Sequence, residues 1–563
     1  MAEKFIASDA PLLELSPGVQ SERIIVSQKL GMRHLMDHFK VSRQSDAGFF
    51  HSPVSSRVLE SALMLHLLRR NEREVEWQRQ LERYLIMNME NTDAIGSIAA
   101  KAVMKLPLDK GAWERAFIFA DNAEYGLRRK RALLTMLLVE LGVTSFEEAR
   151  LFVEDYSARA THLFSRIYAA SLRLIHRRYQ PFEASFLDDI AYLTRMQNIN
   201  GSWEQQILTT LFAMLALGPA CPAFTRGLTY LRRAKRQDGG MPFIDNQNMW
   251  VTCVAGLALQ AVHSRTQLAL EARLAKFIVQ HQHENGGWSF ADGVMQTDAD
   301  VSANCALVLL QQRDRCYKTN IEHALTYFRE LQRPDGGYPT YEREGESEVT
   351  MTANILHASS LAVSQAPSQP YDIERAADYI ASRQRDDGSF ETSWSRSETY
   401  SIFRALWALD IYQKATSTPQ RSSVFLRSFR YLLDAQHSDG GWGQSFGVPS
   451  DALSTAYGIS ALCLTSRENR VEMERMNHAV TYLLSQQDQS TGAFHSIPDL
   501  VGPRPIPFET PLLATIWPLL ALNFVDCHFP GMLISKDSSA RGPRKTDGQG
   551  GVAGPYTRPR NSK

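Results

Sequence analysis

The sequence lacks an excess of either charge. Its 563 residues include 61 Lys and Arg and 61 Asp and Glu, so the formal net charge at pH 7 is zero. Proteins that bind nucleic acid through its phosphates normally carry a concentrated positive charge, and this composition offers none overall. We therefore expect no nucleic-acid partner.

Paired cysteines and long apolar runs are also lacking. The six cysteines are scattered, with no Cys-x-x-Cys pair, which favours reduced, buried thiols and a cytoplasmic location over a disulfide framework. The sequence contains no apolar run of about 18 residues, so we expect no membrane span. The N-terminal MAEKFIASDAPLLELSPG lacks the apolar core of a signal peptide. Contact with a membrane surface and the oligomeric state stay open.

What the sequence does contain is an internal repeat. Segments such as YFRELQRPDGGY (327–338) and YLLDAQHSDGGW (431–442) end a predicted helix with Gln, polar residues, glycine and an aromatic residue. A fixed period indicates a repeat architecture. The later repeats follow each other at intervals of 50 to 52 residues. The first glycine of each turn lies at 201, 239, 286, 336, 388, 440 and 492.

Each repeat unit is expected to consist of two helices. Glycine at the turn supplies the left-handed conformation that commonly ends a helix, and a second helix follows, as in VTMTANILHASSLAV (349–363). We interpret the Gln, Gly and aromatic residues as architectural, capping and holding helices rather than catalysing. Two helices per unit, repeated about six times, can close into an α/α barrel.

One second helix is preceded by a pair of carboxylates. In ADGVMQTDADVSANCALVLL (291–310), Asp298 and Asp300 lie two residues apart before an apolar run, and the next cation is Arg313. Asp298 is a suitable N-cap for a helix that begins near residue 300. Two neighbouring carboxylates can also share a proton, because the charge of one raises the pKa of the other.

These features resemble the class II terpene cyclases, which include squalene–hopene cyclases, oxidosqualene cyclases and bacterial class II diterpene cyclases. The turns resemble the QW repeats of that family over roughly residues 185–525. The resemblance implies an all-α fold of α/α barrel repeats in a double-barrel (βγ-type) architecture. Further segments resemble family landmarks in the family's order: MWVTCVAGLAL (249–259), DADVSANCALVL, ESEVTMTANIL (346–356), GSFETSWSRSETY (388–400) and GPRPIPFETPLLATIWPLLAL (502–522).

The resemblance assigns a role to the acid pair. The family's proton donor is the middle aspartate of an Asp-x-Asp-Asp-Thr-Ala motif, which by position is Asp300, with Asp298 as its neighbour. Such a donor must be protonated near neutral pH, yet acidic enough to protonate an alkene or open an epoxide. Burial and the like charge of Asp298 would raise the pKa of Asp300, and the helix N-terminus would lower it.

The sequence departs from the family at the acid. Val301 stands where the motif has its second adjacent aspartate, and Ser302 stands where it has threonine. Oxidosqualene cyclases also lack that aspartate, so an epoxidised substrate is an alternative to an alkene. On the facing helix, the match to the histidine that partners the acid in squalene–hopene cyclases is Thr352, with Asn354 close by but out of register.

Aromatic side chains are expected to line the cavity, because aromatic faces stabilise a cation without trapping it as a nucleophile would. The motifs that resemble the family assign this role to Trp250, Trp394 and Tyr400. Core packing is about as common a role for any single aromatic residue. Further candidates are Phe290, Phe508 and Trp517, with Val301, Thr352 and Asn354 as other substrate-contacting positions.

Metal chemistry is not expected from the chain itself. The Asp-x-Cys pair with which protein prenyltransferase β-subunits bind zinc in a similar barrel is absent, and so is an Asp-Asp-x-x-Asp ionisation motif. We expect no cofactor, except Mg²⁺ if the substrate is a diphosphate. The basic run LRRKR (127–131) is interpreted as a solvated helix face.

The predicted organisation has four parts. Residues 1–84 would supply the first helices of the catalytic barrel, residues 85–185 an inserted second helical domain, and residues 186–530 the catalytic barrel. Residues 531–563, rich in Gly, Pro, Ser and charge, would form a disordered tail.

The sequence therefore predicts a class II terpene cyclase that acts on a linear polyprenyl substrate. A C15–C20 prenyl diphosphate or its epoxide is favoured, because the chain is shorter than typical triterpene cyclases and GPRPIPFE resembles the diphosphate users. A squalene- or oxidosqualene-type cyclase is one alternative. A catalytically silent α/α-barrel protein that binds isoprenoids, suggested by the altered acid motif, is another.

Overall fold

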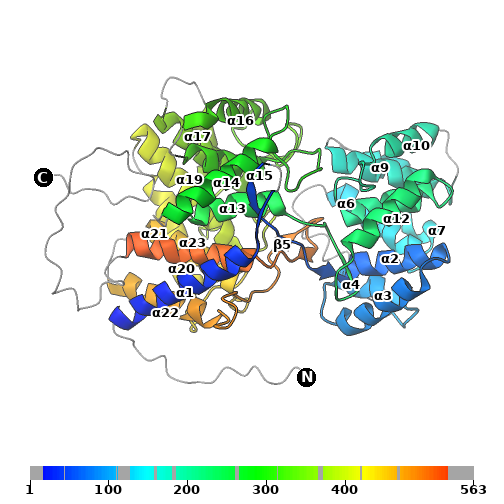
Figure 1. Ribbon diagram of the computed structural model, residues 1–563, viewed down its shortest axis with the longest axis horizontal. Coiled ribbons are helices and arrows are strands. Elements are labelled where there is room, and N and C mark those ends of the chain that lie inside the picture. The colour runs from blue at the N-terminus through cyan, green and yellow to red at the C-terminus, as the bar shows by residue number, and fades with distance from the viewer. Residues whose placement is uncertain are drawn as a thin grey trace, which may run out of the picture.

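The computed structural model contains two helical lobes joined by short strands and loops (Figure 1). The predicted tail, residues 531–563, lies outside the described residues. The structure describes residues 17–42, 45–108, 111, 127–157, 162–180, 186–259, 265–312, 315–365, 372–418, 421–465 and 470–529.

The larger lobe is a closed ring of inner helices. Each inner helix contacts the next along the chain, and the last returns to contact the first. These helices are apolar on nearly every side, as expected for helices enclosed by others. They are α13 (Asn248–Leu259), α15 (Ala299–Leu310), α17 (Val349–Gln365), α19 (Glu398–Thr416), α21 (Ala452–Thr465) and α23 (Leu513–His528).

An outer layer of amphipathic helices covers this ring. Each outer helix buries one face; α18, for example, buries Ala376, Ala377 and Ile380. The N-terminal helix belongs to this layer, since it contacts both α22 and α23. The outer elements are α1 (Pro17–Asp37), α14 (Arg265–Gln280), η1 (Arg315–Tyr317), α16 (Lys318–Leu331), α18 (Ile373–Ser382), α20 (Ser422–Ala435) and α22 (Arg470–Ser485).

The glycine turns join the outer helices to the inner ones. Gly286 has φ +87°, and a side chain there would meet the backbone oxygen of His323 at 2.3 Å, so only glycine fits. Gln282 donates from Nε2 to the oxygen of Gly286 at 2.8 Å, and Trp288 Nε1 donates to the oxygen of Ile278 at 2.7 Å. The Gln and Trp side chains thus hold the turn together, as their architectural interpretation requires.

The smaller lobe, here called the second domain, has its own hydrophobic core. Its helices are inserted between α1 and α13. They are α2 (Val58–Arg70), α3 (Val75–Asn88), α4 (Ala94–Val103), α6 (Leu127–Glu140), α7 (Phe146–Ala149), α8 (Val153–Ser157), α9 (Leu163–His176), α10 (Phe186–Arg195), α11 (Ile207–Leu217) and α12 (Pro222–Ala234). The predicted all-α fold with two helical barrels is confirmed.

The two cores divide the chain at other points than the predicted boundaries. Residues 54–84 and 193–244, assigned to the catalytic barrel from the sequence, contribute to the second core. The reason is that the turns at Gly201 and Gly239 have the same left-handed glycine as the turns of the larger lobe. The turn motif therefore marks helix pairs of either domain. We draw the second domain at 53–244 and the barrel domain at 17–50 and 248–529.

Short antiparallel hairpins and bridges join the domains. The strand pair β3–β4 begins and ends the second domain, and the hairpin β5–β6 brings Ile506 and Phe508 from the barrel domain into the second core. The strands are β1 (Phe39–Val41), β2 (Gly48–Phe50), β3 (Ser56–Arg57), β4 (Met241–Pro242), β5 (Leu500–Val501) and β6 (Pro507–Phe508).

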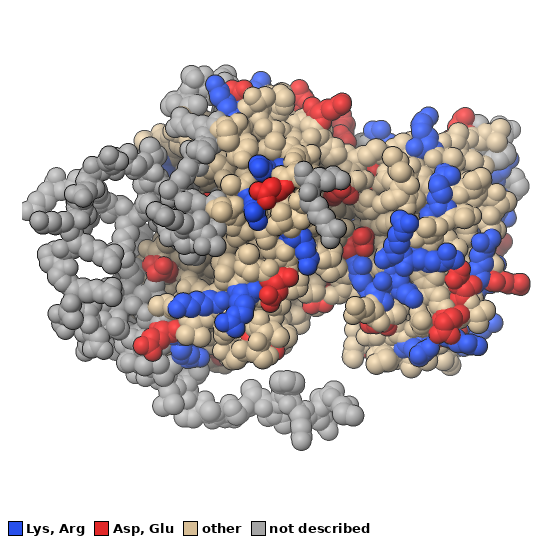
Figure 2. All heavy atoms as spheres, viewed as in Figure 1, with Lys and Arg blue, Asp and Glu red and all other residues tan. Residues whose placement is uncertain are grey.

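The surface agrees with the balanced composition. On the face drawn in Figure 2, acidic and basic side chains are interspersed over both lobes. Within the described ranges, no helix is long and apolar enough to cross a bilayer.

Candidate active site

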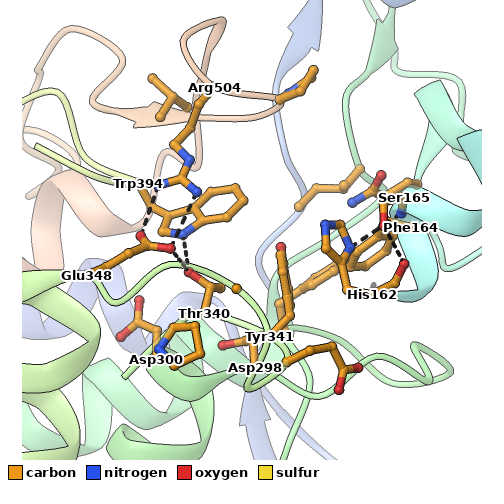
Figure 3. A pocket seen from close by; sticks show the side chains of 18 of the residues that line it. His162, Phe164, Ser165, Asp298, Asp300, Thr340, Tyr341, Glu348, Trp394 and Arg504 are labelled. Carbon is orange, nitrogen blue, oxygen red and sulfur yellow. Dashed lines mark hydrogen bonds and ion pairs between the residues drawn. The ribbon is translucent and has the colours of Figure 1, made fainter. Parts of the chain in front are cut away.

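A cavity of about 280 Å³ lies where the two domains meet (Figure 3). Residues of the inner helices α13 and α15 form one side of it, and residues of α6 and α9 form another. The hairpin β5–β6 contributes a further wall. The cavity is therefore a product of the domain arrangement and not of either barrel alone.

The start of α15 places the two aspartates in this cavity. Asp298 pairs with Trp288 in an isolated β-bridge, and its side chain accepts from the backbone N–H of Val301 at 2.8 Å, so it is the N-cap of α15. Asp300 follows in the first helical turn, and both aspartates line the cavity. Asp298 therefore both caps α15 and lines the cavity.

Asp300 receives three side-chain N–H groups. Its Oδ1 accepts from Nδ2 of Asn304 and of Asn354, each at 2.7 Å, and its Oδ2 accepts from Trp250 Nε1 at 3.1 Å. Asn304 lies one turn further along α15, Asn354 lies on α17 and Trp250 lies on α13. Three adjacent inner helices thus converge on one carboxyl group.

Arg404 on α19 determines which way the two amides face. Its Nε donates to Asn354 Oδ1 at 2.5 Å, and its Nη2 donates to Asn304 Oδ1 at 3.0 Å. Because a guanidinium only donates, both amide oxygens turn toward Arg404 and both amide NH₂ groups turn toward Asp300. Arg404 is 2% exposed, so its positive charge is buried close to the acid.

Burial dominates the electrostatics of the pair. It raises the pKa of Asp300 above its ordinary value, while Arg404 and the three N–H donors act to lower it. Burial also raises the pKa of Asp298, where the Val301 N–H acts to lower it and the charge of Asp300 raises it further. Burial thus favours the neutral form of the Asp300 carboxyl group, while the groups around it stabilise its anion.

Aromatic rings form a wall that crosses from the barrel domain to the second domain. The ring of Tyr341 is edge-on to Trp394, with 5.9 Å between their centres, and edge-on to Phe164 of α9 at 5.6 Å. Phe164 in turn stacks on Phe290, with 6.5 Å between the ring centres. This cavity therefore offers several π faces to a cation.

Polar partners fix the orientation of Trp394. Its Nε1 donates to Thr340 Oγ1 at 2.8 Å, and the guanidinium of Arg504 lies 4.5 Å from the centre of its ring (Figure 3). Arg504 forms an ion pair of 2.9 Å with Glu348, in which the two side chains are 12% and 4% exposed. Thr340 also donates to Glu348 at 2.6 Å, which completes a closed polar network.

The second domain supplies the polar side chains on the opposite wall. His162, at the N-cap of α9, accepts from the backbone N–H of Ser165 through Nδ1 at 3.3 Å, so neutral His162 carries its proton on Nε2. Lys130 of α6 lines the same cavity together with Gln206 and Gln247. The expectation that the run 127–131 is only a solvated face therefore fails at Lys130.

The structure brings most of the predicted site residues together, with three exceptions, Thr352, Tyr400 and Trp517, which lie outside the cavity lining. Asn354 lies against the acid, whereas Thr352 is fully buried, donates to the oxygen of Glu348 at 2.7 Å and accepts from the N–H of Tyr338. Tyr400 packs between Tyr457 and Trp517 behind the acid, outside the cavity lining. The predicted residues that line the cavity are Trp250, Phe290, Asp298, Asp300, Val301, Trp394 and Phe508.

The residues that sequence reasoning missed come from elements far apart in the chain. The only local signal was the spacing of Asn304, four residues after Asp300, which places both on one helix face. Nothing near Arg404 in the sequence connects it with the acid. The further residues missed are Lys130, His162, Phe164, Tyr341, Glu348 and Arg504.

Comparison with known proteins adds independent findings. The family described as "Prenyltransferase alpha-alpha toroid domain" matches residues 225–425 and 349–496. The chain is 31% identical over 497 residues to drimenyl diphosphate synthase of Streptomyces showdoensis, covering 84% of this chain and 90% of that protein. It is 31% identical over 501 residues to drimenyl diphosphate synthase of Streptantibioticus cattleyicolor, covering 84% and 91%.

A solved structure shares the fold. The ent-copalyl diphosphate synthase from Streptomyces platensis superposes with a TM-score of 0.58 at 16% identity, over 89% of this chain and 99% of that chain. At this identity the likeness concerns the fold alone. It agrees with the two helical barrels described above.

Proposed function

Because the chain belongs to the class II terpene cyclases and is an enzyme of that family, we propose that it cyclises a linear C15 prenyl diphosphate by protonating its terminal alkene. The product would be a ring-containing diphosphate, since the diphosphate group takes no part in this kind of initiation.

The arrangement of the Asp300 carboxyl group carries this proposal. Its Oδ1 accepts from two amide NH₂ groups, those of Asn304 and Asn354. An oxygen with two N–H donors is the poorer place for a proton, so the acidic hydrogen belongs on Oδ2. Among the described residues, Oδ2 accepts only the indole N–H of Trp250. Asp300 lines the cavity, so this hydrogen is available to an alkene bound there.

Proton transfer leaves a carboxylate that is already solvated by the protein. The two amides and the indole each donate to it, and charge-assisted hydrogen bonds of this kind are worth about 1.5–3 kcal/mol. Arg404 adds a buried positive charge. These groups strengthen the acid without the second aspartate of the family motif, whose place Val301 takes. They therefore support protonation of an alkene over the epoxide that the sequence left open.

The cation formed next would meet aromatic rings. Trp250, Phe290 and Trp394 line the cavity, and the wall continues through Tyr341 and Phe164. A desolvated aromatic face stabilises a cation by about 2 kcal/mol. We assign these residues the roles of folding the chain and stabilising the successive carbocations.

The size of the cavity favours a short substrate. Ligand cavities usually measure about 300–1,000 Å³, and this one is about 280 Å³. A C15 chain fits such a volume better than a C30 triterpene precursor. The two drimenyl diphosphate synthases match this chain over about nine-tenths of their own length, and they are named for a C15 compound. A C20 prenyl diphosphate is the second choice.

The head group would bind at the second-domain wall. Lys130 supplies a positive charge there, and His162 supplies an Nε2–H donor at the N-terminus of the 14-residue helix α9. Helix N-termini favour anions. This polarity supports binding of the diphosphate at α6 and α9, with the terminal alkene at Asp300.

Mg²⁺ is expected to accompany a diphosphate substrate. Among the residues described, no group of three or more His, Cys, Asp or Glu side chains is arranged to hold a metal ion. These residues therefore do not fit a resident metal, and every step above uses side chains of the chain itself.

The test is product formation by the purified protein. Farnesyl diphosphate, geranylgeranyl diphosphate, squalene and 2,3-oxidosqualene should be incubated separately with Mg²⁺, and the products should be dephosphorylated and identified by gas chromatography and mass spectrometry. We expect a cyclised C15 alcohol from farnesyl diphosphate and little conversion of the C30 substrates. Preferred turnover of either C30 compound would overturn the proposal.

A further inference from the structure

A buried glutamate outside the cavity holds the segment that leads to the acid. Glu204 lies in the second domain, between α10 and α11, and is 0% exposed. Its Oε2 accepts from the backbone N–H groups of Met295 and Gln296, both at 3.0 Å. Asp298, the cap of α15, follows two residues later. The cavity lining does not include Glu204.

The backbone around Glu204 is strained. Glu204 and Gln205 are consecutive non-glycine residues with φ of +57° and +55°. Such a conformation costs about 1–3 kcal/mol for each residue and persists only where surrounding contacts impose it. Here it is stabilised by Tyr230, whose hydroxyl donates to the oxygen of Gln205 at 2.9 Å. The strained residues therefore lie where the second domain contacts the segment of the barrel domain that leads to Asp298 and Asp300.

The held segment is also a junction. The side chain of Gln296 accepts from the backbone N–H of Leu163, at the start of α9, at 2.7 Å. It also donates to Glu342 at 3.1 Å. A second tether runs from Asn198 to the oxygen of Gly293 at 2.9 Å. The acid, the proposed head-group wall and the second domain therefore meet in the segment 293–298.

We propose that Glu204 is a positioning residue for the acid, and that its carboxylate, anchored in the second domain, fixes the segment 293–298 and so aims Asp300 into the cavity. Glu204 touches no reacting atom in this arrangement. Its two hydrogen bonds link the closure of the two domains to the catalytic geometry, because they exist only while the domains stay in contact.

The ionisation of Glu204 makes this clamp depend on pH. Burial raises the pKa of Glu204 to about 7, while the two backbone N–H groups act to lower it. A carboxylate accepts N–H groups more strongly than a neutral acid, so the clamp is tightest above pH 7 and weaker below it. The titratable neighbour is Tyr192 of α10, whose phenol is in turn influenced by Arg166, Arg195 and Arg173. Among the described residues, the groups that donate to the Glu204 carboxylate are the backbone N–H groups of Met295 and Gln296.

Hydrogen exchange tests the clamp without any substrate. In Glu204→Gln at pH 8, the segment containing Met295 and Gln296 should exchange faster than in the wild type, because a neutral amide oxygen holds the two N–H groups more weakly. Glu284→Gln, an exposed change in the same domain as the held segment, is the matched control and should leave this exchange unchanged. Equal protection in Glu204→Gln and wild type would overturn the proposal, whatever the substrate proves to be.

Kinetic measurements then test whether Glu204 positions Asp300 for proton transfer. The proposed C15 reaction serves as the assay, so a wild type that is inactive with every substrate would refute the proposed function and not the clamp. In an active wild type, kcat should rise as pH increases through about 7, and Glu204→Gln should lose this limb. Small misplacements of a catalytic group cost up to about 10²-fold, and we expect a fall in kcat of that order at pH 8, with KM little changed. Faster exchange with unchanged kcat and pH profile would overturn the positioning role.

Discussion

Arg404 donates from Nε to the side-chain oxygen of Asn354 at 2.5 Å, and this bond decides which group Asn354 presents to the acid. An amide can turn either its oxygen or its NH₂ toward a carboxyl group. With its oxygen held by a donor-only guanidinium, Asn354 has only its NH₂ left for Asp300. Arg404 therefore acts on the acid through the amides as well as through its charge.

Asp300→Asn should abolish cyclisation while leaving the fold intact, because the amide keeps the shape of the side chain but has no acidic hydrogen. General acids contribute about 10²–10⁴-fold to rate, and we expect a loss of at least that size. Product formation per enzyme measures it, and the thermal melting temperature serves as the folding control. Turnover close to that of the wild type would show that another group donates the proton.

Arg404→Met should weaken the acid. Without Arg404 the pKa of Asp300 rises, because a lowering influence is removed, so the alkaline limb of the pH–rate profile should move to higher pH. Without Arg404 the two amides are no longer held toward Asp300, and loss of one of their N–H bonds to its carboxylate, worth about 1.5–3 kcal/mol, corresponds to a fall in kcat of roughly 10- to 150-fold. Arg430→Met, on the exposed face of α20, is the matched control. A limb that stays in place would contradict the tuning role.

Asp298→Asn should leave measurable activity and change the pH dependence of stability. The pKa of Asp298 is raised in the folded state, so the folded protein binds more protons than the unfolded one, and ionisation of Asp298 reduces stability as pH rises. Asparagine also caps helices well. The variant should therefore melt at a higher temperature than the wild type at pH 8, with a smaller difference at pH 5.

The same variant should shift the rate profile as well. The charge of Asp300 raises the pKa of Asp298, so the two carboxyl groups titrate as a coupled pair, and removing one of them should shift the alkaline limb of the profile. A greater loss of activity for Asp298→Asn than for Asp300→Asn would reverse the two roles.

Lys130→Gln should weaken binding of the diphosphate without impairing the acid. We expect KM for farnesyl diphosphate to rise about tenfold, the equivalent of one charge-assisted contact, with kcat little changed. Inhibition by inorganic pyrophosphate should weaken in parallel. Arg131→Gln, at the exposed neighbouring position, is the control. Unaltered KM and unaltered pyrophosphate inhibition would place the head group elsewhere.

Part of the site could be predicted because its signals are local. The N-cap position of Asp298 and the placement of Asp300 follow from a few residues around the start of one helix. The helix-ending turns follow from their glycines, because glycine readily adopts the left-handed conformation. The register of the motif points to Thr352 as the partner of the acid, whereas the structure has Asn354 in that role. Thr352 instead serves the turn that precedes α17, a task that the repeat pattern assigns to its position.

The rest could not be predicted because it depends on closure of the ring and contact between domains. Arg404 reaches Asn304 across 100 positions of sequence. The basic run around Lys130 predicts an exposed helix face. Lys130 lines the cavity because α6 faces the barrel domain. The two cores divide the chain elsewhere than at the predicted boundaries for a related reason, since Gly201 and Gly239 have the same left-handed turn as the glycines of the other barrel.

Cyclisation of farnesyl diphosphate in D₂O is the most direct measurement of the proposed chemistry. Protonation of the terminal alkene by Asp300, whose acidic hydrogen exchanges with solvent, should put one deuterium on the ring methylene next to the gem-dimethyl carbon, in a product that keeps its diphosphate. Asp300→Asn should give no such product. A wild-type product without deuterium at that carbon, or a labelled product from Asp300→Asn, would contradict initiation by this acid.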